Sequence, residues 1–510
     1  MTVILHHAPV RTSRSPRLRV GLLSLLGLFG APALVGLLGL TISLVGIGIP
    51  SVWYDEAATV ISATRSWPQL GAMIANVDLV HAAYYALMHV VFDLFGYSPV
   101  SLRVPSAIAI GIAAAFTVVL GRVLDKPRLG VIGGIVFCLL PRVTWAGTEG
   151  RSYAATAALA VILTTVLVVA SRGSRRSLWV LYAALVVVSC VTFVYLALVV
   201  VAHAVTMAWW FASSRSRVWP PAARWARYTA LATAIVVPFG LGVVAQSGQL
   251  HWLDAPDKNT LRQVVEGQWF YTSPQFALVG WALLAAGAFL VLRSSRGLSP
   301  ASVLLPALVL PTVLLLVVSA VTTPIYTPRY LTMCAPFVAL VIAAAIDRMR
   351  PTPLVAVALL ALATLALPQI IAQRQPEAKD DAAWPRVAAL IASQRALDGP
   401  DSTTAIVYGG VQRHPIASAR VMAYTYPNAF ADTIDVTLGT PAAETGELWE
   451  TRIPLTDGLP RLARADVTFL ITSTARDARP ATTDTLSAAG WHVADEWSLP
   501  AVHVLRYERD

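Results

Sequence analysis

Long apolar runs are the feature that most constrains how this chain can fold. Stretches of about 20 residues with almost no charged side chain recur between residues 20 and 371, and a helix of that length crosses the hydrocarbon core of a bilayer. Of the 510 residues, 56% are hydrophobic and 13% are charged, whereas a soluble protein carries roughly 25% charged residues. The sequence therefore predicts a polytopic α-helical membrane protein and excludes a soluble globular fold.

Eleven of these runs are predicted to span the membrane. They lie near residues 20–48, 103–121, 129–147, 150–171, 177–193, 194–212, 228–246, 274–292, 301–321, 330–347 and 352–371. A further apolar segment, His81 to Phe95, is shorter and contains His81, His89 and Asp93. Because ionisable side chains are costly inside hydrocarbon, we expect this segment to lie in the plane of the membrane surface, within one large external loop of residues 49–102.

Basic residues set the predicted orientation. If His81–Phe95 does not span, all basic loops share the side of the N-terminal arginines Arg11, Arg14, Arg17 and Arg19. These loops hold Arg122/Lys126/Arg128, Arg172/Arg175/Arg176, Arg215/Arg217/Arg224/Arg227, Arg293/Arg296 and Arg348/Arg350. The positive-inside rule then places the N-terminus in the cytoplasm and the C-terminal tail outside a cell membrane. The net charge of +10 reflects these loops, so no nucleic-acid partner is expected. The first run exceeds the ~7–15 apolar residues of a signal peptide and predicts an uncleaved helix.

The composition changes near residue 373. Residues 1–373 are predicted to form the transmembrane domain, and residues 374–510 a soluble extracytoplasmic α/β domain. Its expected elements are a helix over Trp384–Ala396 and strands over Thr404–Tyr408, Val467–Ile471 and Ala501–Tyr507. Strands that alternate with helical segments are typical of a small α/β domain. The cysteines, Cys138, Cys190 and Cys334, fall inside apolar runs, so no disulfide framework is expected.

Ionisable side chains gather at the predicted external ends of the spans. In chain order they are Asp55, Glu56, Asp78, His81, Glu149, Arg151 and Arg329. Asp55 and Glu56 directly follow the first span, and we expect both to stay ionised in water at the membrane surface. Arginine binds phosphate through two parallel N–H groups, and a carboxylate can accept the proton of a hydroxyl as a general base. One face therefore combines the groups needed to act on a lipid-linked phosphate.

Five short motifs follow one another between residues 50 and 335. They are Trp53-Tyr54-Asp55-Glu56, His81-Ala82-Ala83-Tyr84-Tyr85, Phe95-Gly96-Tyr97 followed by Arg103-Val104-Pro105-Ser106, Glu149-Gly150-Arg151-Ser152-Tyr153, and Pro328-Arg329-Tyr330-Leu331. Their sequence and order resemble the GT-C glycosyltransferases, most closely the family 39-like, protein-mannosyltransferase and aminoarabinose-transferase type. Two alanines replace the family's prolines in the second motif. The C-terminal domain lies outside the resemblance.

The resemblance implies a GT-C fold and an enzyme that transfers a sugar from a polyprenyl phosphate with inversion at the anomeric carbon. Asp55 falls at the family's catalytic-base position, with its neighbour Glu56 as the alternative base. Donor phosphate binding would fall to Arg329 and Arg151, assisted by Tyr330 and Tyr153. Substrate binding would involve His81, Asp78, Tyr85 and Glu149. No cofactor is required, although some relatives use a divalent metal, for which Asp78 and His81 are the possible ligands.

The sequence leaves several alternatives open. The composition, rich in alanine, valine and arginine, is typical of an actinobacterium, in which decaprenyl-phosphate mannose and decaprenyl-phosphate arabinose are the candidate donors. Mannose is favoured, because the motifs look more like the mannosyltransferase type, and arabinofuranose is the alternative. The acceptor is a cell-envelope glycan, a glycolipid or a protein. A flippase or transporter of lipid-linked sugars is the competing class, but such proteins place ionisable residues near mid-membrane. Arg151 is equally suited to pairing with Glu149 and to binding phosphate. Trp269-Phe270-Tyr271 is expected in an interfacial aromatic belt, with stacking on a sugar as the alternative.

Overall fold

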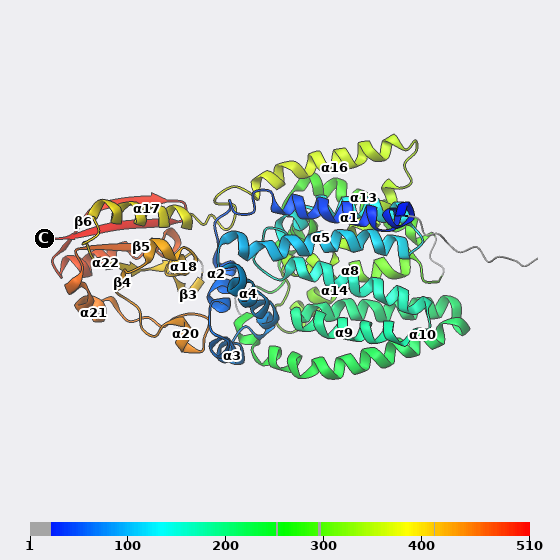
Figure 1. The fold of residues 1–510 in the computed structure, drawn as a ribbon, viewed down its shortest axis with the longest axis horizontal. Helices are drawn as coiled ribbons and strands as arrows, with labels where there is room; N and C mark the ends of the chain where they lie inside the picture. The colour runs from blue at the N-terminus through cyan, green and yellow to red at the C-terminus, as the bar shows by residue number, and fades with distance from the viewer. Residues whose placement is uncertain (1–21, 251–252, 294–296, 413) are drawn as a thin grey trace, which may run out of the picture.

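The computed structural model describes residues 22–250, 253–293, 297–412 and 414–510. Figure 1 shows a helical bundle at one end of an elongated molecule and a β-sheet at the other. The long helices of the bundle are α1 (Leu22–Leu44), α5 (Pro99–Val123), α6 (Pro127–Leu139), α8 (Tyr153–Arg172), α9 (Arg176–Thr192), α10 (Ala197–Ala245), α13 (Pro274–Leu292), α14 (Pro300–Val321), α15 (Ala335–Ile346) and α16 (Pro353–Ala372).

The predicted multi-pass architecture is confirmed. Within the described ranges, eight helices are long and apolar enough to cross a membrane, and three shorter apolar helices, Gly30–Leu44, Pro127–Leu139 and Arg176–Thr192, coincide with the remaining predicted spans. The apolar segment Leu79–Phe95 forms η1 (Leu79–His81) and α4 (Ala82–Phe95). These lie with α2 (Tyr54–Ala63) and α3 (Trp67–Asn76) at the end of the bundle nearest the sheet (Figure 1). We call this end the domain end.

Helix α10 supplies two predicted spans, 194–212 and 228–246, without a break in its helical backbone. Both of its ends contact the same loop. Phe193, which precedes η2 (Val194–Leu196), stacks on His81, and Gln246, which follows α10, accepts a hydrogen bond from the backbone N–H of Leu79. A straight helix of 49 residues would be about 74 Å long, so α10 bends back on itself and forms two antiparallel spans.

The predicted span 129–147 is split into two helices. Leu140 is extended (φ −61°, ψ 124°), because the ring of the following Pro141 disfavours helical geometry in the residue before it. Helix α6 therefore ends at Leu139, and the short α7 (Pro141–Ala146) begins after it. The break brings Arg142 and Trp145 onto a separate helix at the domain end.

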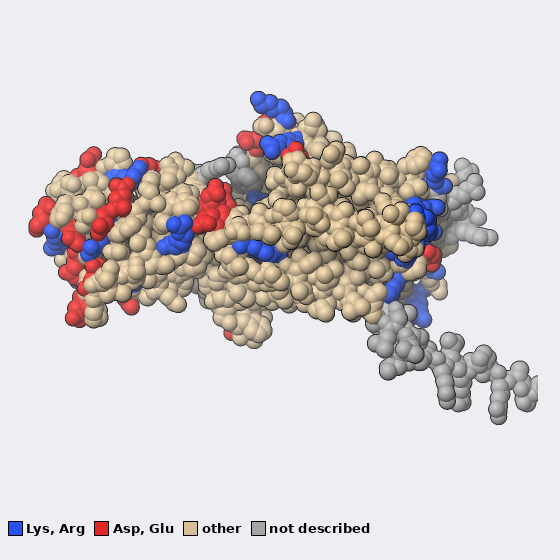
Figure 2. All heavy atoms as spheres, turned by 90° about the horizontal axis from the view of Figure 1, so that it is seen from above, with Lys and Arg blue, Asp and Glu red and all other residues tan. Residues whose placement is uncertain are grey.

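Basic loops meet at the opposite end of the bundle, which we call the basic end. Arg128 pairs with Asp347 at 3.1 Å, and Arg172 pairs with Asp125 at 2.8 Å. Figure 2 shows lysine and arginine gathered at the end far from the sheet, the distribution that the positive-inside rule describes. The arginines at positions 11, 14, 17, 19 and 296 and the side chains of Arg215 and Arg217 lie outside the described residues.

The C-terminal residues form a five-stranded sheet in the order β4-β1-β5-β7-β6. Its strands are β1 (Thr404–Tyr408), β4 (Ile434–Asp435), β5 (Val467–Ser473), β6 (Trp491–Leu499) and β7 (Val502–Arg509); a hairpin of β2 (Gly410–Val411) and β3 (His414–Ser418) lies beside them. Strand β1 is parallel to β4 and β5, whereas β7 is antiparallel to β5 and β6. The three predicted strands coincide with β1, β5 and β7, and the predicted helix with α17 (Trp384–Asp398).

Shorter helices complete the C-terminal region and the loops of the bundle. They are α18 (Val421–Thr425), α19 (Pro427–Phe430), α20 (Ala442–Thr445), α21 (Leu455–Gly458), η6 (Leu459–Arg464), η7 (Thr474–Arg476) and α22 (Arg479–Ser487) after the bundle, and η3 (Ser247–Leu250), α11 (Lys258–Arg262), η4 (Gln263–Gly267), α12 (Gln268–Phe270) and η5 (Pro328–Cys334) within it.

One face of the sheet shares its core with the external loop. Side chains alternate along a strand, so Ile406 and Tyr408 face one core while Ala405 and Val407 face another. The core of Ile406 continues into buried residues of α2, α3 and α4. Hydrogen bonds cross the same boundary, among them those from the Val52 N–H to the Tyr426 hydroxyl (3.0 Å), from the Tyr97 hydroxyl to the Thr425 carbonyl (2.9 Å) and from Arg65 to the Glu447 carbonyl (2.6 Å).

Removal of residues 374–510 should destabilise the loop of residues 49–102. The truncation exposes apolar surface, whose burial contributes roughly 25 cal/mol per Å², and it removes the partners of Tyr97 and Arg65. We expect limited proteolysis to cut this loop faster in the truncated chain than in the full chain. Cleavage at the basic end is the internal control and should not change. Equal protection of the loop in both chains would show that it folds without the C-terminal region.

Candidate active site

Asp55 lies in the first turn of α2 and forms an ion pair with Arg329. Trp53 is extended (φ −128°, ψ 179°), so the helix begins at Tyr54 with both acidic residues in its first turn. Carboxylates are favourable there because the helix N-terminus carries a partial positive charge. Nη1 of Arg329, in η5, lies 2.6 Å from Oδ2 of Asp55, and both side chains are largely buried. The external loop and a late span therefore meet at this pair.

Glu56 is closed off from solvent, which corrects the expectation that it lies in water. Arg103 of α5 donates from Nε and Nη2 to its two carboxylate oxygens at 2.7 and 2.6 Å, and both side chains are 0% exposed. Lys379 Nζ and the Gly150 N–H donate to Oε1 at 2.7 and 2.8 Å. Although burial raises the pKa of Glu56, the charges of Arg103 and Lys379 bring it below the ordinary value. Both carboxylate oxygens of Glu56 are therefore occupied by donors from Arg103, Lys379 and Gly150.

Glu149 lies on the other side of Lys379. Its Oε2 accepts a hydrogen bond from Lys379 Nζ at 2.9 Å, and its Oε1 accepts one from the indole N–H of Trp53 at 2.7 Å. Lys379 also donates to the Thr148 carbonyl at 2.6 Å. Burial raises the pKa of Glu149; Lys379 opposes this shift, and the negative charge of Glu56 adds to it. Lys379 is therefore the cation that faces both glutamates.

Arg151 contacts Tyr85 rather than Glu149 among the side chains that the structure describes. Its Nη1 donates to the Tyr85 hydroxyl at 2.9 Å, and that hydroxyl donates to Oδ2 of Asp78 at 2.7 Å. Asp78 has a φ of 59°, in the left-handed region that aspartate tolerates better than most residues. Burial raises the pKa of Asp78 despite the opposing effects of Arg151 and Tyr85. Arg151, Tyr85 and Asp78 thus form a second polar group beside the Asp55–Arg329 pair.

Aromatic rings surround this polar group. His81 stacks on Phe193 with ring centroids 6.2 Å apart, and Tyr330 lies 6.3 Å from Tyr153 and 5.2 Å from Phe193. Burial, together with the charges of Arg151 and Arg329, lowers the pKa of His81 well below its ordinary value. The imidazole is therefore neutral at physiological pH. His81, Tyr153 and Tyr330, which the sequence predicted for the site, therefore contribute neutral rings around its charged residues.

A divalent metal does not fit Asp78 and His81. Within the described ranges, no group of three His, Cys, Asp or Glu side chains could hold a metal ion. One Asp78 oxygen is occupied by Tyr85, and the positive charges of Arg151 and Arg329 act on His81. A cation site needs several oxygen or nitrogen ligands without competing cations.

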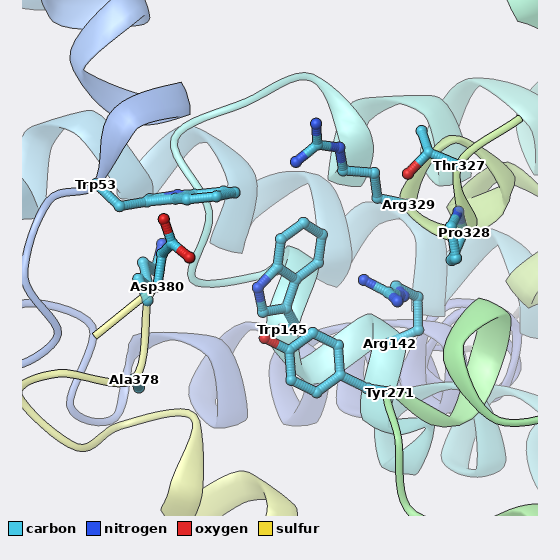
Figure 3. Close-up of a pocket in the computed structure, with 10 residues that line it drawn as sticks. Trp53, Arg142, Trp145, Tyr271, Thr327, Pro328, Arg329, Ala378 and Asp380 are labelled. Carbon is cyan, nitrogen blue, oxygen red and sulfur yellow. The ribbon is translucent and has the colours of Figure 1, made fainter. Parts of the chain in front are cut away.

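A cavity of about 250 Å³ opens beside Arg329. Its lining includes Trp53, Arg142, Trp145, Tyr271, Arg329 and Lys379. Figure 3 shows the guanidinium group of Arg329 pointing toward Trp53, with Trp145 below. Arg142 lies beside the stacked rings of Trp145 and Tyr271, 4.9 and 4.8 Å from their centroids, and donates to the Gln268 carbonyl at 3.2 Å. The cavity thus combines aromatic walls with positive charge.

Sequence reasoning missed three of these lining residues. Tyr271 was expected in an interfacial belt with Trp269 and Phe270, but Trp269 and Phe270 are buried and Tyr271 faces the cavity. Trp145 reaches the cavity only because α6 breaks at Pro141. Lys379 was passed over because it follows the last span in a region assigned to the tail. Its position as an isolated lysine just after that span was the available signal.

Solved structures share this fold. ArnT from Cupriavidus metallidurans in the apo state matches with a TM-score of 0.59 and 13% identity, over 95% of this chain and 98% of that one. ArnT bound to undecaprenyl phosphate matches with a TM-score of 0.56 and 14% identity over the same shares. The archaeal oligosaccharyltransferase AglB from Archaeoglobus fulgidus, in complex with an inhibitory peptide and a dolichol-phosphate, matches with 0.50 and 11%, over 89% of this chain and 70% of that one.

These likenesses confirm the predicted GT-C fold. No protein-family model and no curated protein sequence matches the chain. Because the match to ArnT covers 95% of this chain, it includes most of the C-terminal domain. The expectation that this domain lies outside the resemblance is therefore wrong at the level of fold, although the short motifs themselves end before it.

Replacement of Arg103 should strongly destabilise the protein. Arg103→Met leaves Glu56 with Lys379 alone, and breaking a buried ion pair costs about 3–5 kcal/mol. The pKa of Glu56 is lowered in the folded state, so its stabilising contribution is present above the pKa of the unfolded chain and is lost as pH falls. We therefore expect the gap in unfolding free energy from wild type to be largest near neutral pH and to narrow below about pH 4.

Unfolding in detergent, followed by circular dichroism across pH, measures this gap. Arg128→Met is the matched control, because Arg128 and Asp347 form a partly exposed pair of the kind that contributes about 0–1 kcal/mol. A loss for Arg103→Met no larger than for this control would contradict the assigned role of Glu56.

Proposed function

We propose, from the shared GT-C fold and the geometry at Asp55, that this chain is a glycosyltransferase that takes a sugar from a polyprenyl-phosphate donor. The acceptor is an extracytoplasmic glycan, glycolipid or protein of the cell envelope. Mannose is the favoured sugar, as the motifs indicate, and arabinofuranose is the alternative. The solved ArnT and AglB complexes contain undecaprenyl phosphate and a dolichol-phosphate, which supports a lipid-phosphate donor here.

The observation that carries this proposal is the position of Arg329. Its guanidinium contacts Asp55 at 2.6 Å and also lines the 250 Å³ cavity. A phosphate in that cavity would bind Arg329 through charge-assisted hydrogen bonds and would compete with Asp55 for it. Donor binding would therefore release a carboxylate next to the sugar. The aromatic walls of Trp53, Trp145 and Tyr271 suit the apolar face of a sugar ring or the first isoprene unit.

The proposed reaction is a single inverting displacement. An acceptor hydroxyl oxygen attacks the anomeric carbon while the bond from that carbon to the donor phosphate oxygen breaks. Asp55 accepts the hydroxyl proton as general base. The bond-breaking electron pair stays on the lipid phosphate, whose negative charge Arg329 stabilises. The step needs no nucleotide, and its atoms and charges balance without a cofactor.

The remaining candidate residues support this centre. Arg151 extends the positive field next to Arg329, and Tyr85 and Asp78 hold Arg151 in place. His81, Tyr153 and Tyr330 enclose the site with rings. Glu56 and Glu149 hold the first turn of α2 in place through their hydrogen bonds with the Gly150 N–H and with Trp53.

The proposed orientation follows from charge. Basic residues gather at the basic end (Figure 2), so the positive-inside rule supports a cytoplasmic basic end and an extracytoplasmic domain end. In this proposal residues 1–373 form the membrane domain, residues 374–510 form the extracytoplasmic domain, and the chain resides in the cell membrane.

Replacement of the proposed base tests the mechanism. Asp55→Asn keeps the shape of the side chain but removes its ability to take a proton, so we expect kcat to fall about 10²–10⁴-fold, the usual contribution of a general base. Asp93→Asn is the matched control, because Asp93 is an exposed acid in the same loop that pairs with His89. Product formation by purified protein in detergent or liposomes measures both. A fully active Asp55→Asn enzyme would refute the assignment of Asp55 as the general base.

The donor is identified by incubating the protein with radiolabelled polyprenyl-phosphate mannose and, separately, polyprenyl-phosphate arabinose, followed by analysis of the glycosylated product. Transfer from only one of the two donors would identify the sugar that the enzyme transfers. Movement of labelled lipid across liposomes without any glycosyl product would instead support the flippase class.

A further inference from the structure

The segment between α16 and α17 passes through the domain end of the bundle. Arg374 donates to the carbonyls of Val45 and Ile42 at 2.7 and 2.5 Å, and the Pro376 carbonyl accepts a hydrogen bond from the Ser51 N–H at 2.8 Å. Gln412, after β2, donates to the Asp380 carbonyl at 2.5 Å. This segment is therefore attached both to the membrane bundle and to the C-terminal sheet.

Lys379 belongs to this segment and is buried in the site. It is 4% exposed, and its Nζ donates to Glu56, Glu149 and the Thr148 carbonyl at 2.7, 2.9 and 2.6 Å. An ammonium group has three N–H donors, so all three have acceptors. The buried cluster then contains two acids, Glu56 and Glu149, and two cations, Arg103 and Lys379, and its net charge is zero.

The acceptors of Lys379 hold the two chain segments that flank the proposed base. Glu149 accepts the indole N–H of Trp53, the residue before α2. Glu56 follows Asp55 directly and also accepts the Gly150 N–H. A shift of either glutamate would therefore rotate or translate the first turn of α2, and Asp55 with it.

We propose that Lys379 is a positioning residue for Asp55, through which the C-terminal segment completes the reactive centre. Lys379 balances the charge of Glu56 and Glu149 and so holds Trp53 and the first turn of α2 in the geometry that aims Asp55. This inference rests on the proposed glycosyltransferase function and deepens it, because it makes residues beyond the last span part of the active site.

Other titratable groups also face the cluster. Tyr84 of α4, Tyr97 before α5, Tyr271 after α12 and Tyr426 after α18 each interact electrostatically with Glu56 or Glu149. Burial raises the pKa of Tyr84 and Tyr97 above their ordinary values, so these phenols stay neutral in the range in which a glutamate would gain or lose a proton. Asp380 lines the cavity next to Lys379.

The first test measures charge coupling without any activity assay. Lys379→Met leaves two buried glutamates with Arg103 alone, so Glu149 takes up a proton in the folded state and its pKa rises further above that of the unfolded chain. The variant therefore loses stability as pH rises from the pKa of Glu149 in the unfolded chain to its higher pKa in the folded variant. We expect the Tm deficit of Lys379→Met relative to wild type to be larger at about pH 8 than at about pH 5. Adding Glu149→Gln, which restores neutrality and retains an acceptor for Trp53, should remove most of the deficit.

The second test measures positioning. With the donor that supports transfer, Lys379→Met should lower kcat by about 10²-fold, the effect of a misplacement of about 1 Å, while KM for the donor stays near the wild-type value. Lys379→Met/Glu149→Gln should recover part of kcat. Lys126→Met, which changes an exposed lysine at the basic end, is the matched control and should leave both constants unchanged.

The outcomes separate this inference from the proposed function. A pH-independent Tm deficit that Glu149→Gln does not reduce would overturn the charge coupling, whatever the activity of the protein. A raised donor KM with unchanged kcat would show that Lys379 binds the donor phosphate directly, and would overturn the positioning role. Wild-type protein that transfers no sugar from any polyprenyl phosphate would refute the proposed function, while the Tm measurements would still decide whether Lys379 balances the two glutamates.

Discussion

The buried cluster of Glu56, Arg103, Lys379 and Glu149 is the interaction on which the rest of the site depends. Its four charges come from α2, α5, the segment after α16 and the turn after α7. Taking a charge out of water costs several kcal/mol, which is offset only when its partners are in place. Both glutamates therefore have cationic partners only when the loop, the bundle and the C-terminal segment have all assembled. Asp55 acquires its geometry as a consequence of this assembly.

The membrane explains why the polar groups lie at one end. Inside hydrocarbon an ionisable side chain is costly, so the spans are apolar. Their main contribution to the site is to hold its polar residues in place. Close packing of these spans matters for the site. A Cβ at Gly36 of α1 would lie 2.9 Å from the Gly111 carbonyl of α5, so only a residue without a side chain permits this approach. Helices α1 and α5 in turn carry the chain into and out of the external loop.

Local patterns predicted much of this architecture. Hydrophobic length predicted the spans, and β-rich apolar runs predicted β1, β5 and β7. The charge of the loops predicted that His81–Phe95 does not cross. The failures have one kind of cause. The aromatic run at Trp269–Tyr271 looks the same in sequence whether its rings face lipid or a cavity. Glu56 and Asp55 are adjacent acids, and their partners distinguish them: Arg103 and Lys379 contact Glu56, whereas Arg329 contacts Asp55.

By itself, therefore, the sequence determined the membrane class, the position of the long apolar helices, the order of the elements and the motif residues at one face, because each depends on hydrophobic or charge patterns within a short stretch of chain. The tertiary structure alone decided which acid faces Arg329, which is sealed by ion pairs, and that Lys379 enters the site from beyond the last span. Glu56 and Lys379 are 323 residues apart, and no local pattern encodes a contact at that separation. It arises because two buried charges are stable only when the fold brings them together.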